Sequence, residues 1–204
     1  MPRPRSLTHT GIATAALAVL DSDGLDGLTM RAVAKELGVG TMSLYRYVTD
    51  RDQLEGLVVD LVLDGLDLTV PARASAAKRL AILAERIHET VGAHPAVVPL
   101  LVSRRHLSAG TRRWGEAVLG VLAEAGFTGK RRVIAFRTLM SYVLGALQAA
   151  VLGALSGAGT TALAELPAED FPFLADTARH ARNVPAKEEF RRGVEIVIRG
   201  LDLP

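Results

Sequence analysis

The sequence contains no cysteine, and this absence excludes disulfide bonds and metal sites built on thiolates. The lack of cysteine is compatible with a reducing compartment, so we expect a cytoplasmic protein. Aromatic residues make up only 4% of the chain, and no long segment alternates apolar and polar residues as a half-buried strand does. These absences favour an all-α fold.

A large net charge is also missing. The formal net charge is only +2, so the overall charge balance does not by itself indicate nucleic-acid binding. Such a function has to be argued from the local placement of residues. The N-terminal segment MPRPRS has two arginines but no apolar run behind it, so we do not expect a secretory signal.

The common catalytic motifs are absent as well. The sequence has no G-x-S-x-G, no paired-histidine zinc spacing and no G-x-x-x-x-G-K phosphate loop. The segment GAGTTA at 157–162 has the letters of a dinucleotide fingerprint, but it follows a long helical run rather than a strand. We therefore expect no enzyme activity, no cofactor and no metal. A small helical enzyme or a lipid carrier stays open as an alternative.

Helical periodicity covers almost the whole chain. Thr8, Thr29 and Asp50 stand where N-caps of three helices are expected, and Gln53 completes a capping pair with Asp50. A short helix from Thr41 to about Tyr47 lies between the second and the third of these caps. Later helices are predicted over 75–92, 95–101, 108–125, 129–155 and 187–201, with a loop over 156–170.

The longest uncharged stretch, residues 138–164, reaches the length of a membrane span. Gln148 interrupts it, and small residues recur every four positions from Gly145 to Gly157. Small residues at this spacing allow two helices to approach closely, in a bilayer or in a soluble bundle. We expect a buried bundle or dimer helix without a membrane, and keep a membrane anchor as the alternative.

Residues 29–47 have the form of a helix-turn-helix. Two short helices are joined by a turn of about three residues that contains Gly38 and Gly40. Leu44 and Val48, four residues apart, are predicted to face the core. The positions left free to meet DNA carry hydroxyl, thioether and guanidinium groups: Thr41, Met42, Tyr45, Arg46 and Tyr47.

The start of the next helix offers a second place for a phosphate. Backbone N–H groups at residues 50–52 and the positive end of the helix dipole suit an anion, and Arg51 adds a full charge. The alternative for the whole segment is a plain helical hairpin whose tyrosines pack on neighbouring helices.

The longer string over residues 7–63 resembles the DNA-binding domain of the tetracycline-repressor (TetR) family of transcription regulators. The resemblance is carried by AAL in the first helix, by GLDGLTMRAVAKELGV and by SLYRYVTDRDQL. It implies an all-helical homodimer, with an N-terminal three-helix helix-turn-helix domain and a C-terminal helical bundle. Such a protein binds a palindromic double-stranded DNA operator and releases it when a small-molecule effector enters the C-terminal domain.

The resemblance also implies roles for individual residues. Arg31, Thr41, Met42 and Tyr45 correspond to positions that read or approach bases, and Thr29, Ser43, Tyr47 and Arg51 correspond to phosphate contacts. The family often has histidine where this chain has Tyr47, so the contact made by Tyr47 is open. Lys35 is predicted to lie on the same general surface, where its side chain is solvated.

Residues 94–148 are similar to the ligand-binding domain of tetracycline repressors in particular, through an HP-initiated helix, an AGF connector and a YVLG helix. That subfamily uses a histidine followed by a GT turn to bind a drug with magnesium. His106 with Gly110 and Thr111 is the nearest counterpart, but its spacing differs by two residues, so a surface or core histidine is favoured.

We predict a DNA-binding domain over 1–66 and a ligand-binding and dimerisation domain over 67–204. Dimerisation is expected through the helices over 129–155 and 187–201, which are apolar enough to need burial. An effector pocket in a helical bundle is mostly apolar with a few polar groups. The candidate lining residues are His94, His106, Trp114, Phe136, Met140 and Gln148.

Overall fold

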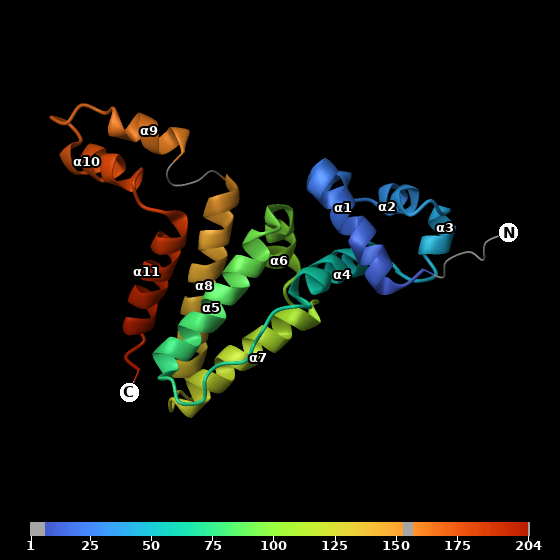
Figure 1. Cartoon of the computed structure of the whole chain (residues 1–204), viewed down its shortest axis with the longest axis horizontal. Coiled ribbons are helices and arrows are strands. Elements are labelled where there is room, and N and C mark those ends of the chain that lie inside the picture. Colours follow the sequence, from blue (N-terminus) through green and yellow to red (C-terminus); the bar gives the residue numbers. More distant parts are fainter. Residues whose placement is uncertain (1–6, 153–156, 204) are drawn as a thin grey trace. The chain divides into compact units, whose positions relative to one another are not determined.

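The computed structural model describes residues 7–152 and 157–203, which form helices and connecting turns without a strand among them (Figure 1). The predicted all-α class is confirmed. The chain divides into two compact units. The first unit holds residues 1–69 and 86–118, and the second holds residues 70–85 and 119–204. Residues 86–118 therefore group with the N-terminal helices, although they lie beyond the predicted domain boundary at residue 66.

The caps predicted for the first two helices are present. Helix α1 (His9–Gly27) begins after Thr8, whose hydroxyl oxygen accepts the N–H of Gly11 at 3.1 Å. Helix α2 (Met30–Glu36) begins after Thr29, whose hydroxyl oxygen accepts the N–H of Ala32 at 3.1 Å. Each side chain satisfies an N–H that has no partner inside its helix.

A tight turn joins α2 to α3 (Thr41–Leu44). Gly38 ends the preceding helix with a φ of 66°, a left-handed conformation that costs other residues free energy. Helix α3 is shorter than predicted, because residues 45–47 form turns in place of a further helical turn. The backbone nevertheless still curls through this segment, since the N–H of Val48 donates to the carbonyl of Leu44 at 3.1 Å.

Helix α4 (Arg51–Leu63) starts with the predicted capping pair. The carboxylate of Asp50 accepts the N–H of Gln53 at 2.8 Å, and the side-chain oxygen of Gln53 accepts the N–H of Thr49 at 2.7 Å. Helices α1 and α4 pack against each other. Both contribute apolar side chains without solvent exposure: Ile12, Ala16, Leu20, Leu54, Val58 and Val59.

In the first unit, α6 packs on α4, and the short turn before it packs on α1. A 3-10 turn, η1 (Pro95–Val97), leads into α6 (Val98–Arg104), and α7 (Ala109–Glu124) follows. The carboxylate of Asp60 accepts the hydroxyl of Ser108 at 2.7 Å and the N–H of Gly110 at 2.9 Å. Ser108 in turn accepts the N–H of Thr111 at 3.0 Å. Asp60 on α4 therefore helps to cap the start of α7.

In the second unit, α8 (Gly129–Leu152) packs against α11 (Ala186–Arg199). Tyr142 stacks on Phe190 with ring centroids 5.6 Å apart, and its hydroxyl donates to the carbonyl of Phe190 at 3.2 Å. Gly193 provides the space for this ring, because a Cβ at that position would overlap the Tyr142 hydroxyl. Helix α5 (Ala76–Gly92) contributes its first ten residues to this unit.

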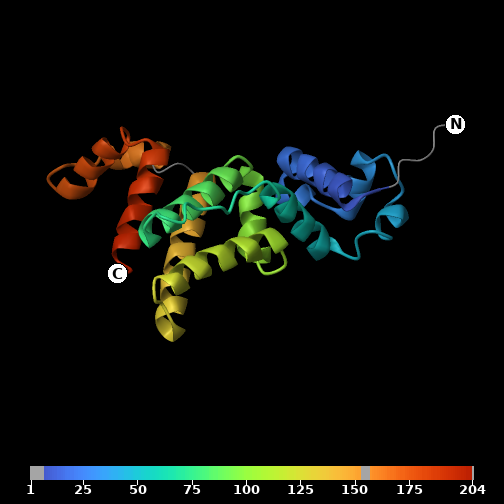
Figure 2. The ribbon, with the colours of Figure 1, turned by 60° about the horizontal axis from the view of Figure 1, so that its bottom comes forward.

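Two short helices lie where the sequence predicts a loop or no element. Helix α9 (Ala158–Ala164) falls in the predicted loop over 156–170, which is therefore wrong for this part, and α10 (Pro172–Ala181) has no counterpart in the prediction. The two helices lie side by side (Figures 1 and 2). Glycine and threonine in 157–162 favour a loop, but the alanines favour helix, and packing on α10 decides between the two.

Replacing Gly193 by alanine is expected to lower the free energy of unfolding by about 1–3 kcal/mol, because the new methyl group overlaps Tyr142. Gly120 is the matched control, since a Cβ there meets nothing within 4 Å. Its replacement by alanine is expected to be neutral or stabilising by up to about 1 kcal/mol. Chemical denaturation of both variants measures the difference, and equal effects would contradict the role given to Gly193.

Replacing Asp60 by alanine is expected to lower the free energy of unfolding by about 1–2 kcal/mol, because Ser108 and Gly110 lose a shared acceptor. Asp64, exposed at the end of the same helix, is the matched control. Its replacement by alanine is expected to change stability by less than about 0.5 kcal/mol. Thermal unfolding of both variants checks the prediction, which fails if Asp60→Ala melts like the control.

Candidate nucleic-acid interface

The segment that follows the α2–α3 turn has one buried face and one exposed face. Leu44 and Val48 have no solvent exposure. Met42 is 79% exposed and Tyr45 is 45% exposed, although both are large hydrophobic residues. Thr41, Ser43 and Tyr47 are half-buried. Burial of the two aliphatic residues therefore turns the thioether and the phenol outward.

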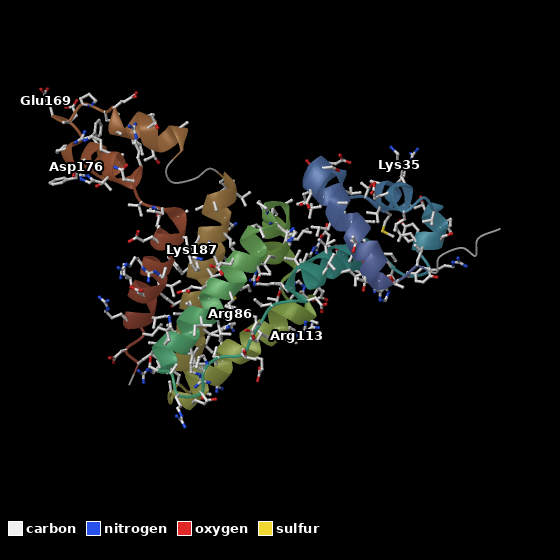
Figure 3. The ribbon with its side chains drawn as sticks, in the orientation of Figure 1. Lys35, Arg86, Arg113, Glu169, Asp176 and Lys187 are labelled. Atoms are coloured by element: carbon white, nitrogen blue, oxygen red, sulfur yellow. The ribbon has the colours of Figure 1, made fainter. Side chains whose placement is uncertain are left out.

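Helix α2 adds further groups to this region. Arg31 is exposed, and Thr29 is exposed while its hydroxyl caps the helix. Figure 3 shows Lys35 projecting from α2 into solvent. A guanidinium, several hydroxyls and a thioether are thus presented by α2 and α3, and these groups can bind phosphate oxygens and base edges.

His9 stabilises this arrangement, a role that the sequence did not indicate. Its Nε2 lies 3.0 Å from the backbone carbonyl oxygen of Tyr47, within hydrogen-bonding distance. The contact ties the start of α1 to the turn after α3, although 38 residues separate the two in the chain. No local pattern could have predicted it, because the pairing depends on how α1 packs.

Arg51 is held by bonds within the chain. Its Nε donates to the carboxylate of Glu55 at 2.7 Å, and one terminal nitrogen donates to the carbonyl of Leu25 at 2.9 Å. A guanidinium has five N–H groups, so Arg51 keeps further donors for a phosphate while its position is fixed. The structure thus gives Arg51 a structural role beside the predicted contact.

Glu55 and Arg104 complete this arrangement and were missed from the sequence. Glu55 is buried on α4, and its second oxygen accepts Nε of Arg104 at 2.8 Å. The hydrogen bond from Arg104 to Glu55 raises the pKa of Arg104, so the guanidinium is charged at every physiological pH. The four-residue spacing of Arg51 and Glu55 could have indicated their pair, but nothing local indicates Arg104.

The six predicted effector-binding residues fall into two groups. His94, His106 and Trp114 belong to the first compact unit, and Phe136, Met140 and Gln148 belong to the second. Trp114 is buried, whereas His94, Phe136 and Met140 are half-buried. His106 and Gln148 are exposed, so neither is a buried polar group in need of an internal partner.

The turn that corresponds to the drug-binding histidine motif has a structural role in this chain. Gly110 and Thr111 lie at the capped start of α7, and a Cβ at Gly110 would overlap the side chain of Leu63. These residues pack and cap, while His106 lies exposed in the preceding turn. No group of three or more histidine, aspartate or glutamate residues suited to a metal ion occurs among the described residues.

A groove of about 550 Å³ lies within the second unit, and none of the six predicted residues lines it. It runs between the start of α5 and α11. Its charged lining balances three bases against three acids, so no charge class of ligand is favoured: Lys78, Arg191, Arg199, Glu85, Glu195 and Asp202.

Helix α8 is long and apolar enough to cross a membrane by length and composition. Only 22% of its most apolar window is buried in the chain, and its first turn carries Lys130, Arg131 and Arg132. The small residues Gly145 and Ala149 lie on it, while Gly153 is outside the described residues. Helix α8 thus retains apolar surface that the single chain leaves uncovered.

Family comparisons cover both halves of the chain. Residues 12–54 match the family described as bacterial regulatory proteins of the tetR family. Residues 71–203 match the family described as the tetracyclin repressor-like C-terminal domain. The resemblances inferred from the sequence for the two regions are confirmed.

Named relatives agree with these matches. The HTH-type transcriptional repressor DrrR1 of Streptomyces coeruleorubidus is 36% identical over 148 residues, which span 71% of this chain and 54% of that protein. An HTH-type transcriptional regulator of Saccharopolyspora erythraea is 32% identical over 206 residues, covering 96% of this chain and 84% of the relative. Both relatives are named as regulators of transcription.

Solved structures give the same result. Apo ActR from Streptomyces coelicolor superposes with a TM-score of 0.83 at 28% identity, over 98% of this chain and 96% of ActR. The complex of ActR with actinorhodin gives a TM-score of 0.82 at 28% identity, over 97% of this chain and 96% of ActR. With both family matches, these likenesses show that the chain belongs to the TetR family of transcriptional regulators.

Proposed function

We propose that this chain is a homodimeric repressor that binds a palindromic DNA operator and releases it when a small-molecule effector binds. The observation that carries the proposal is the two-faced segment after the α2–α3 turn, with Leu44 and Val48 fully buried beneath exposed Met42 and Tyr45. A packed helix-turn-helix that leaves such side chains outward has the geometry that reads a major groove.

The residues divide into base-proximal groups and phosphate contacts. Arg31, Thr41, Met42 and Tyr45 are proposed to meet base edges, where methionine can contact a thymine methyl and arginine can bind guanine. The second group is proposed to position the protein on the DNA backbone through hydroxyl and guanidinium donors: Thr29, Ser43, Tyr47 and Arg51. Tyr47 is half-buried, and the contact between its backbone carbonyl oxygen and the ring of His9 holds it in place.

Dimerisation is proposed to use α8 and α11. Helix α8 exposes Ile134 and Val151, and α11 exposes Ile196 on the side opposite its buried residues. Burying these helices against the same helices of a second copy would remove this surface from water and give a two-fold axis. The recognition segments of the two copies, residues 41–48 of each, must then lie about 34–36 Å apart, or near a multiple of that distance, to enter successive turns of the major groove.

Effector binding is proposed for residues 67–204, with residues 1–66 as the DNA-binding domain. ActR was crystallised with actinorhodin, so a related chain with the same fold binds a small molecule. The candidate lining residues proposed from the sequence are His94, His106 and Trp114 in the first unit, and Phe136, Met140 and Gln148 in the second. Release from DNA requires an effector that binds more tightly to the state with wrongly spaced recognition segments.

The other expectations follow from the family. The named relatives are regulators of transcription, so catalysis is not part of the proposal, and no cofactor is assigned. A regulator acts where its operator lies, so a cytoplasmic location is part of the proposal. Helix α8 is accordingly proposed to bury its apolar surface in the dimer.

Replacing Tyr45 by alanine is expected to weaken operator binding by about 1–3 kcal/mol, or roughly 5- to 150-fold, because a base-proximal ring and hydroxyl are lost. The operator is first recovered by selection from random duplexes and from DNA flanking the gene. Fluorescence anisotropy at two salt concentrations then compares the variant with the parent chain on operator and scrambled duplexes.

Tyr45→Phe is the matched control, since it keeps the ring and removes only the hydroxyl. It separates ring contacts from a hydrogen bond, and binding to scrambled DNA should stay the same in both variants. Unchanged operator affinity in Tyr45→Ala would refute the assignment of Tyr45. Failure of the parent chain to select any duplex would refute the proposed function itself.

A further inference from the structure

Four charged residues form a connected network where α4 begins. Arg51 and Arg104 supply two positive charges, and Asp52 and Glu55 supply two negative charges. Nε of Arg51 and Nε of Arg104 donate to different oxygens of Glu55, at 2.7 and 2.8 Å. The two terminal nitrogens of Arg104 lie 2.6 and 3.0 Å from the two oxygens of Asp52.

The geometry of Arg104 is suited to binding both carboxylates at the start of α4. All three of its nitrogens bind carboxylates of α4, although Arg104 itself ends α6, about fifty residues away in the chain. A side-by-side pair of N–H···O bonds to Asp52 uses the planar fork of the guanidinium, which lysine cannot reproduce. The contact is therefore more than a nearby surface charge.

The two carboxylates differ in their surroundings. The Glu55 side chain is only 5% exposed, so its charge has to be compensated inside the chain. The Asp52 side chain is 54% exposed in the first turn of α4. An exposed carboxylate at this place would repel a phosphate, because charges within about 8–10 Å act on each other at physiological salt.

We infer that Arg104 is a positioning residue for operator binding: it neutralises Asp52 and Glu55 and, through Glu55, fixes Arg51 at the start of α4. The inference rests on the proposed function, because it needs α4 to approach a DNA phosphate. Arg104 acts through its neighbours and is not itself a DNA contact. Without it, the exposed Asp52 would face the phosphate, and Arg51 would be the single counter-charge for both acids in the network.

Replacing Arg104 by methionine tests this role, with Arg105→Met as the matched control. Arg105 is the next residue, is exposed, and donates to the carbonyl of Val102 in its own helix, so both variants lose one positive charge. Arg104→Met is expected to weaken binding to the selected operator at least about tenfold. Arg105→Met is expected to stay within about twofold of the parent chain.

The double variant Arg104→Met with Asp52→Asn separates charge neutralisation from folding. Removing the Asp52 charge is expected to restore operator affinity to within about threefold of the parent chain, because the phosphate no longer meets an unpaired carboxylate. The slope of log affinity against log salt should be the same for the double variant and the parent chain. A slope smaller by about one would show that Arg104 contacts phosphate directly, and this result would overturn the inference.

If Arg104→Met does not unfold cooperatively, Arg104→Lys and Arg105→Lys replace the first pair. Lysine keeps the charge but cannot bind both carboxylates with three nitrogens, so Arg104→Lys should lose about three- to tenfold in affinity and Arg105→Lys none. Equal affinity in the two variants of either pair overturns the inference. So does a double variant that melts like the parent chain yet does not regain affinity. A parent chain that selects no operator instead refutes the proposed function.

Discussion

The burial of Leu44 and Val48 is the constraint on which the recognition segment depends. The segment from Thr41 to Val48 has few apolar side chains, and these two lose all contact with water. Because they lie four residues apart, they bury one side of the stretch and leave Met42 and Tyr45 on the exposed side. A fixed orientation for Tyr45 and Met42 is thus a consequence of packing, and needs no bond from either side chain to the protein.

Backbone and charge interactions give that orientation its precision. Side-chain caps fix where α1, α2 and α4 begin, and the positive φ of Gly38 fixes the turn between α2 and α3. The contact of His9 with the carbonyl of Tyr47 and the bond from Arg51 to the carbonyl of Leu25 then join segments distant in the chain. Each bond satisfies a backbone group and also places a side chain near the proposed DNA surface.

The charged network at the start of α4 places a buried acid next to the proposed phosphate contact. Glu55 by itself would disfavour both folding and phosphate binding. Arg51 and Arg104 compensate its charge with short hydrogen bonds, which turn it into a support for the two guanidinium groups. Helix α6 is in this way attached to the helix that begins beside the recognition segment.

The sequence by itself determined the helix-turn-helix, its caps and its family, because these features are local: Thr8, Thr29 and Asp50 bond to groups three residues away, and Leu44 with Val48 follows helical periodicity. Tertiary structure decided what depends on distant partners. Arg104 meets Asp52 and Glu55 only after α6 packs on α4, and Gly110 is needed only because Leu63 lies against it. The predicted loop contains α9 for a related reason, since α9 packs against α10. Spacing along a chain predicts neighbours within a helix, whereas packing between helices depends on the whole set of buried surfaces.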